Sequence, residues 1–445
     1  MNRQRIATLT YVSQLRNSIR DWLPTRSLPL IDGVRWSDRI LAVCAIVWSW
    51  AAGSTQAQRF EAARDAVVKM YPSRRRPGKT LAGFMQALVQ RSEHLLALLS
   101  EHLRQRMERA LEGPPGRSGA AGWRIGRWIA FAADSTKLDC PMTRANEREL
   151  GCASREKSWP QMVLATLVHL GSGLPWSWRL GPACSSEREL LVRMLEDLPL
   201  HSLLVADAGF VGFDLFKTIL ACGHSLLIRV GANVHLIEKL GYALEECDGL
   251  VYLWPKDGQK RGLSPLVLRK ITIVDGRNRR MVLLTNVLDK TLLSDAQAAE
   301  LYRRRWGIEL FYRTLKQTMG RGKMLSDSPR HAEIEGNWMM LGLWMLGLIL
   351  LEHKPAEAPA QSQSVAQALH AVRDAMAGRI RPGHRKLERV LRLALKDAYV
   401  RANAKAARHW PHRKNPPPPG EPQARMAEEA EIRLANEMKR LRPAA

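Results

Sequence analysis

Several familiar features are missing from this 445-residue chain, and each absence narrows the kind of protein it can be. The six cysteines form no C-x-x-C pair, and no histidine pair completes a zinc-binding pattern. We therefore expect free thiols in a reducing cytosol. The opening segment MNRQRIATLTYVSQ lacks the apolar core of a signal peptide. The most apolar stretches, 40–52 and 338–351, are shorter than the roughly 18–20 residues that span a bilayer, so we expect buried helices and no membrane partner.

Negative charge is also scarce. The chain has 68 Lys and Arg residues against 43 Asp and Glu, which gives a formal net charge of +25. Its hydrophobic content of 46% indicates a globular protein and not a disordered basic tail. An excess of this size is typical of proteins that bind a polyanion, most often nucleic acid. A soluble basic protein without such a partner is the alternative.

Changes in periodicity divide the first two thirds of the chain. Residues 1–112 have a helical pattern, and the basic turn PSRRRPGK between two helices suits DNA docking as well as an ordinary helical bundle. Glycine and proline mark a linker at 113–122. Strands and helices alternate in 123–233, which predicts an α/β sheet. We interpret 234–292, which is rich in strand patterns, as an insertion into the α/β domain.

The last third completes that domain and adds a basic region. Residues 293–372 are predicted to form the second part of the α/β domain. Residues 373–414 carry 13 Lys and Arg against 3 Asp and Glu in a helical pattern. They are interpreted as a second DNA surface, part of an interface between protomers, or a solvated basic helix. A proline-rich linker and a terminal helix are predicted for 415–445.

The segment LYRRRWGIELFYRTLKQ, at 301–317, places Glu309 among four arginines. In a continuous helix, with about 100° per residue, one face carries Glu309 together with Tyr302, Arg305, Trp306, Arg313 and Lys316. The opposite face, formed by Ile308, Phe311 and Leu315, can pack on a sheet. The basic row suits DNA phosphates. The glutamate is explained either by a divalent cation between it and a phosphate or by i,i+4 ion pairs with Arg305 and Arg313.

Two aspartates follow apolar strands: Asp134 in FAADST and Asp207 in LLVADAGF. A carboxylate at the end of a buried strand can leave the core and line an active site, although it can also cap a turn or a helix. With Glu309 there are three carboxylates, which can hold a pair of Mg²⁺ ions about 4 Å apart for in-line phosphoryl transfer. The rival acids near these segments are Asp139, Asp214 and Glu300.

The pattern Tyr302-x2-Arg305-x3-Glu309-x6-Lys316 resembles the Tyr-Arg-Glu-Lys signature of bacterial insertion-sequence transposases. These are cut-and-paste DDE enzymes with an RNase H-like catalytic domain. The ADST and ADAGF blocks resemble those around the two aspartates of that family, and the likeness covers roughly residues 120–350. It implies an α/β RNase H-like catalytic domain interrupted by a β-rich insertion, with helical N-terminal and C-terminal regions.

The resemblance also implies roles for individual residues. The metal-binding and catalytic triad would be Asp134, Asp207 and Glu309, holding two Mg²⁺ ions for which Mn²⁺ can substitute. The groups that would bind DNA phosphates are Tyr302, Arg305 and Lys316, with Arg313 on the same face. Members that form a DNA hairpin often carry a tryptophan before an LLLT-like strand, to stack on a flipped base. Met281 stands in that place here, and Trp254 is another candidate, so excision by another route stays open.

The function predicted from these patterns is DNA transposition near the bacterial nucleoid. The helical region 1–112 would bind the terminal inverted repeats, and a homodimer would pair two ends of the double-stranded DNA. Cleavage at each end would free a 3′-OH that attacks target DNA. The alternatives are an RNase H-like nuclease that does not join strands and a catalytically inactive DNA-binding protein derived from a transposase.

Overall fold

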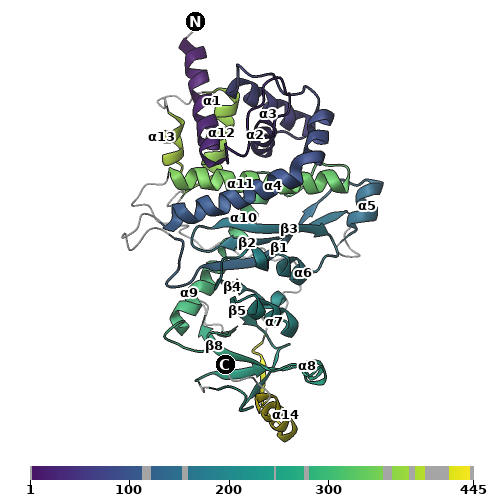
Figure 1. Cartoon of the computed structure of the whole chain (residues 1–445), viewed down its shortest axis with the longest axis vertical. Helices are drawn as coiled ribbons and strands as arrows, with labels where there is room; N and C mark the ends of the chain where they lie inside the picture. Colours follow the sequence, from purple (N-terminus) through teal and green to yellow (C-terminus); the bar gives the residue numbers. More distant parts are fainter. Residues whose placement is uncertain are drawn as a thin grey trace, which may run out of the picture.

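The computed structural model of the chain describes residues 3–112, 122–152, 159–244, 247–274, 280–353, 363–379, 386–395 and 420–440. Most of the predicted linker at 113–122, and the part of the basic region between 396 and 414, lie outside these residues. The protein is an elongated mixed α/β structure, with helices gathered at one end and a large sheet running toward the other (Figure 1).

The N-terminal region is helical, as predicted. It consists of α1 (Arg3–Trp22), α2 (Asp38–Trp50), α3 (Gln56–Met70) and α4 (Leu81–Glu112). Helix α3 begins after Thr55, whose side chain accepts a hydrogen bond from the backbone N–H of Gln58. Helix α2 is buried along its whole length from Ile40 to Trp50, because the surrounding helices and α11 cover it on every side.

One ten-stranded sheet runs through the rest of the molecule, in the order β10-β6-β7-β8-β9-β5-β4-β1-β2-β3. Its strands are β1 (Ala130–Asp139), β2 (Gln161–His169), β3 (Leu174–Pro182), β4 (Leu203–Ala206), β5 (Ser225–Val230), β6 (His235–Glu238), β7 (Leu250–Leu253), β8 (Leu266–Val274), β9 (Arg280–Thr285) and β10 (Gln423–Met426). Strands β1, β2 and β3 are antiparallel neighbours, whereas β4 lies parallel to both β1 and β5. Strand β9 pairs antiparallel with β5, so strands β6 to β9 continue the same sheet.

Helices cover and connect these strands. The helices after the first strand are α5 (Arg144–Leu150), α6 (Glu187–Val192), α7 (Phe213–Ala221), α8 (Lys256–Lys260), α9 (Asp295–Arg305), α10 (Gly307–Arg313), α11 (Pro329–Glu352), α12 (Val365–Ala377), α13 (Leu387–Arg392) and α14 (Glu429–Arg440). Short 3₁₀ turns occupy Leu195–Asp197 and Ala208–Phe210, and a π-helical turn occupies Thr314–Thr318.

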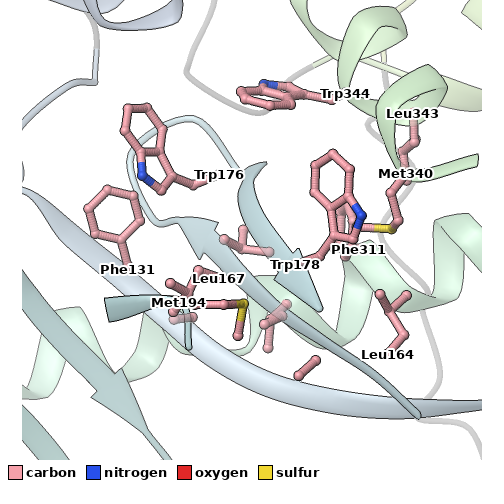
Figure 2. Packing of buried hydrophobic residues seen from close by; sticks show 14 of the residues in the cluster. Phe131, Leu164, Leu167, Trp176, Trp178, Met194, Phe311, Met340, Leu343 and Trp344 are labelled. Carbon is pink, nitrogen blue, oxygen red and sulfur yellow. The ribbon is translucent and has the colours of Figure 1, made fainter. Parts of the chain in front are cut away.

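Helix α11 joins the helical end of the molecule to the sheet. It is long and apolar enough to cross a membrane, but 89% of its apolar window is buried inside the protein. Trp344 of α11 meets Trp178 of β3 edge to face, with ring centroids 6.0 Å apart, and Phe311 of α10 packs beside them (Figure 2). The predicted burial of this helix is therefore confirmed, and the N-terminal helices and the sheet share one hydrophobic core.

The C-terminal segment closes the far edge of the sheet. Strand β10 lies parallel to β6, and α14 follows it. Arg425 Nη1 donates to Glu431 at 2.8 Å, and Gln259 of α8 donates to the same carboxylate at 3.2 Å. The terminal helix was expected from the sequence. The strand before it was not, because four residues carry too little pattern to reveal a strand that pairs at a distant edge.

Candidate active site

Asp134 and Asp207 are brought together by the parallel pairing of two strands. Ala132 of β1 lies opposite Val205 of β4, and continuing this register by two residues places Asp134 beside Asp207. Strand β4 ends at Ala206, whereas β1 continues to Asp139 because β2 still pairs with it. The sequence suggested that Asp134 follows the end of its strand, but Asp134 lies within β1. It lies where the buried part of the strand stops and the parallel neighbour departs.

The environment of Asp134 favours its neutral form. The pKa of this carboxyl is raised to about 6. Burial is the main cause and the nearby charges of Asp207 and Glu187 add to it, against the lowering effect of the Ser135 backbone N–H and of Arg305. The Ser135 N–H donates to Asp134 Oδ1 at 2.8 Å. A carboxyl with a pKa this close to neutrality, beside a second acid, is typical of functional sites.

Asp207 also has a local structural role. Its Oδ1 accepts a hydrogen bond of 2.9 Å from the Gly209 N–H and caps the short 3₁₀ turn that follows. The capping interpretation is thus confirmed for this residue. It does not exclude a functional role, because a carboxylate has two oxygens and about four lone-pair positions.

The helix that carries Glu309 is broken where the sequence predicted a continuous one. Helix α9 ends at Arg305, Trp306 forms the junction, and α10 begins at Gly307. Arg305 Nη2 and Glu309 Oε1 lie 3.2 Å apart across this junction. The predicted i,i+4 pair between them is therefore present. The predicted packing face of Ile308, Phe311 and Leu315 is buried, as expected.

Arg305 is the central cation of this site. It is 7% exposed, and its guanidinium lies over the Tyr302 ring at 5.5 Å. Burial lowers the pKa of Arg305, but the charges of Tyr302, Asp207, Asp134 and Glu309 outweigh this effect and raise it overall. One buried guanidinium is thus within electrostatic range of all three predicted carboxylates. Its Nε is buried without a hydrogen-bond partner among the described residues.

Two further contacts fix the glutamate helix on β1. The Tyr312 hydroxyl of α10 donates to the backbone oxygen of Asp134 at 2.7 Å. Lys316 Nζ donates to the backbone oxygen of Lys137 at 2.7 Å. Lys316 lies in the π-helical turn, a form of helix that is frequent at functional sites. Arg313, the remaining predicted phosphate ligand on this face, is exposed.

The donor chemistry of the three carboxylates fits a hard divalent cation, since all of its ligands would be oxygen atoms. Within the described ranges, however, no three side chains of His, Cys, Asp or Glu gather closely enough to form a metal-binding group. Arg305 instead supplies positive charge near all three acids. The residues therefore fit the chemistry of a metal site, in an arrangement that is more open than a closed ligand cluster.

The rival acids have structural partners. Asp139 Oδ1 accepts a hydrogen bond of 2.7 Å from Gln161. Asp214 pairs with Arg261 at 3.1 Å on the surface. Glu300 is held by Arg304 at 2.8 Å on the exposed side of α9. These contacts account for the three acids without a role in the site.

The two predicted base-stacking residues lie in the sheet extension. Trp254 is 3% exposed, and its Nε1 donates to the Leu263 backbone oxygen at 2.7 Å, so its ring is not available to a base in this structure. Met281 lies on β9 opposite Ile273 and is partly buried.

Sequence reasoning missed two residues around the site, Glu187 and Arg229. Glu187, the first residue of α6, accepts a hydrogen bond from the Ser135 hydroxyl next to Asp134. Arg229 of β5 lies near the Tyr302 hydroxyl. Burial raises the pKa of this hydroxyl, and the charges of Arg305 and Arg229 partly offset that effect. Trp306, at the helix junction, is 59% exposed. The sequence had already placed this indole on the face of Glu309, whereas Glu187 and Arg229 lie far from Glu309 along the chain.

A comparison with known families bears directly on this arrangement of two strand-borne aspartates and a helix-borne glutamate. Residues 129–346 match the family described as the transposase DDE domain. Over this range the chain is similar to the DDE transposases. The matched range includes β1, β4, α9, α10 and the larger part of α11, and therefore all three acids.

One relative of this chain is the transposase InsG for insertion sequence element IS4 from Escherichia coli (strain K12). The two are 28% identical over 184 residues, which is 40% of this chain and 41% of that relative. The chain thus matches less than half the length of the relative. A solved structure titled "Cryo-EM structure of piggyBac transposase synaptic complex with hairpin DNA (SNHP)" aligns with 89% of this chain and 86% of that chain, at 11% identity. Its TM-score of 0.36 supports no conclusion about this chain.

Proposed function

We propose that this chain is a metal-dependent DNA transposase that cleaves the ends of an insertion sequence and transfers the freed 3′-OH to target DNA. The observation that carries the proposal is the convergence of Asp134, Asp207 and Glu309 around the buried Arg305 within a transposase DDE domain. Acids alone would repel a phosphodiester. Acids interleaved with a buried arginine suit a site that takes both a divalent cation and a phosphate.

The core of the sheet supports an RNase H-like catalytic domain. Three antiparallel strands, β3-β2-β1, are followed by the parallel strands β4 and β5, and the predicted acids lie where β4 leaves β1. Strands β6 to β9 come between β5 and the glutamate helix in the chain. We infer that they are the β-rich insertion of such a domain, which here extends the sheet edge.

Asp134, Asp207 and Glu309 would hold the cation, with Mg²⁺ as the expected ion and Mn²⁺ as a substitute. When bound, a pair of such ions supplies an activated nucleophile and stabilises the attacking and leaving oxygens. The chain's own part is positioning. Tyr312 holds the β1 backbone at Asp134. The buried Nε of Arg305, which has no hydrogen-bond partner among the described residues, would donate to an anionic ligand such as a phosphate.

The basic surface supports double-stranded DNA as the partner. Arg313 is exposed beside the site, Lys316 lies close to it, and the chain has a net charge of +25. Transposition joins two element ends, so we propose that a homodimer acts on them, with the N-terminal helices binding the inverted repeats. Strand transfer in addition to cleavage would separate this function from that of a nuclease with the same fold.

The proposal is tested with labelled duplexes taken from the DNA that flanks the gene, in Mg²⁺ or Mn²⁺. Wild-type protein is expected to cut at the element end and to join that end to a target plasmid. The Glu309→Ala variant is expected to bind the same duplex and to leave it intact. Binding without cleavage by the wild type, once both ends are supplied, would instead indicate a DNA-binding protein without transposase activity.

A further inference from the structure

We propose that two loops of the helical region, 26–36 and 72–79, form one surface that binds the double-stranded DNA of the element end. The first loop lies between α1 and α2, and the second lies between α3 and α4. Both therefore belong to the helical end of the molecule (Figure 1). The inference rests on the proposed function, because it names the part of the N-terminal region that would contact the inverted repeats and assigns this contact to loops.

Contacts between the two loops join them into a single surface. Arg74 of the second loop forms an ion pair with Asp32 of the first. The next residue, Arg75, donates a hydrogen bond from Nη1 to the backbone oxygen of Gly33. The basic turn that the sequence places between two helices is therefore attached to a second loop, about 40 residues earlier in the chain, and the two loops would meet a ligand together.

The helices beneath hold this surface in place. Trp36 of the first loop packs on Phe84 of α4, with ring centroids 5.4 Å apart, and Arg91 of α4 donates to the Trp36 backbone oxygen at 2.6 Å. Gly78 of the second loop lies against the same indole, since a Cβ atom at this glycine would be 2.9 Å from Trp36 Nε1. Arg64 of α3 donates to the Gly78 backbone oxygen at 3.0 Å. A surface that is already ordered loses little conformational freedom when a duplex binds to it.

The surface carries a local excess of positive charge. The two loops contain six Lys and Arg residues and a single acid, Asp32, which is paired with Arg74. The other five cations are exposed: Arg26, Arg35, Arg75, Arg76 and Lys79. Within the described ranges, none of these five forms an ion pair with an acid. Their charge is therefore available to the phosphates of a DNA backbone.

Two apolar side chains lie among these cations. Ile31 is 54% exposed and Val34 is 42% exposed, and both belong to the first loop. Single exposed aliphatic residues are common on protein surfaces, but these two flank the residues that join the loops. An aliphatic side chain gains nothing from a phosphate, whereas it suits a base edge such as the methyl group of thymine in the major groove. The cations thus fix the position of the duplex, and Ile31 and Val34 contact its bases.

The test measures the affinity of the full-length protein for two labelled duplexes at several salt concentrations. One duplex is taken from the DNA that flanks the gene, and the other has the same composition in scrambled order. Arg76→Gln combined with Lys79→Gln removes two exposed cations, so we expect weaker binding to both duplexes. The slope of log K against log salt should become smaller by about 1.8, because each phosphate contact contributes about 0.9.

The matched control removes the same charge at the far end of the molecule. Lys256→Gln combined with Lys260→Gln changes two exposed lysines of α8 (Figure 1). This control should bind both duplexes as the wild type does. Equal losses in the two double variants would show that only net charge matters and would overturn the proposed surface. The proposed function would still stand in that case, provided that the wild type cuts the element end.

A second double variant tests the base contacts. Ile31→Ala combined with Val34→Ala keeps every charge, so binding to the scrambled duplex should change little. The preference for the flanking duplex over the scrambled one should fall by about fivefold or more, which is the effect of losing one correct base pair. An unchanged preference would mean that these two residues do not read the bases.

Target DNA has the same backbone as the element end, and a strand-transfer assay separates the two sources. The surface is assigned to the element end, so Arg76→Gln with Lys79→Gln should lower end binding itself. Unchanged end binding with a loss of joining to a target plasmid would assign the surface to target DNA and overturn the proposal. If the wild-type protein binds neither duplex, the DNA partner of the proposed function is wrong as well.

Discussion

Arg305 and Glu309 form an ion pair of 3.2 Å across the junction between α9 and α10. The arginine is almost fully buried, whereas the glutamate side chain is 38% exposed. The same guanidinium lies within electrostatic range of Asp134 and Asp207, so one buried positive charge faces all three acids. Binding of a cation would release the guanidinium for a phosphate, because both compete for the same carboxylate.

The three predicted ligands should be needed for cleavage and dispensable for folding. We expect Asp134→Asn, Asp207→Asn and Glu309→Gln each to lower the rate of end cleavage by about 10²–10³-fold or more, as loss of one preorganised electrostatic group does. Binding to the same duplex should persist. Glu300→Gln is the matched control, since Glu300 lies on the neighbouring helix and pairs with exposed arginines. Cleavage at the wild-type rate by any one of the three variants would remove that residue from the site.

Removal of the buried guanidinium should make the protein depend on metal for stability. Arg305→Ala leaves the acids without their central cation, and we expect the free energy of unfolding to fall by about 1–3 kcal/mol. Added Mn²⁺ should then raise the melting temperature more in the variant than in the wild type, because ligand binding stabilises the folded state. Arg303→Ala, which removes an exposed arginine of α9, is the control. Equal thermal shifts in the two variants would contradict this role of Arg305.

Metal binding should weaken as the pH falls through about 6. Asp134, with its pKa raised to about 6 chiefly by burial, is ionised above this value and protonated below it. A proton and a cation compete for the carboxylate, so Mn²⁺ affinity measured between pH 5 and 8 should rise with pH across this window. In Asp134→Asn, the remaining Mn²⁺ affinity should not rise with pH across this window.

The raised pKa of Asp134 also makes the folding stability of the metal-free protein depend on pH, in the opposite direction to metal binding. The pKa of Asp134 in the folded state lies above its unfolded value, so folding favours the protonated form. Its contribution to stability is present below the unfolded pKa, near 4, and is lost as the pH rises toward 6. Asp134→Asn should therefore raise the melting temperature of the metal-free protein at pH 7.5 and have little effect near pH 4. A lower melting temperature at pH 7.5 would show that the ionised carboxylate stabilises the fold.

A buried ion pair should hold the N-terminal helices on the part of the protein that contains the sheet. Arg59 of α3 and Glu335 of α11 lie 3.3 Å apart, and the backbone N–H groups of Leu325 and Ser326 each donate to Glu335 at 3.0 Å. Glu335→Ala leaves a buried arginine and two donors unpaired, so we expect a loss of about 3–5 kcal/mol in the free energy of unfolding.

Chemical denaturation measures this loss, and Glu333→Ala is the matched control. Glu333 lies on the same helix, but it pairs with Arg330 at the surface, where such pairs contribute about 0–1 kcal/mol. A loss from Glu335→Ala no larger than that from the control would show that the buried pair does not join the two parts.

Local patterns in the sequence were sufficient for several parts of this structure. Alternating and continuous apolar runs predicted β1 to β5, and the apolar face of Ile308, Phe311 and Leu315 predicted which side of α10 packs on the sheet. They also singled out Asp134 and Asp207, because a polar residue after a buried run is visible in the sequence itself. These features depend on neighbours along the chain, and periodicity records such neighbours directly.

The tertiary structure alone decided which of these residues meet. The register of β1 against β4 sets Asp134 beside Asp207, and the packing of α6 brings Glu187 to Ser135. The break at Trp306, the burial of Trp254 and the joining of β9 to β5 in one sheet were equally invisible in the sequence. The physical reason is the same in each case. Hydrogen bonding and packing between segments far apart in the chain determine these contacts, and a local pattern shows that a segment has a partner but does not show which one.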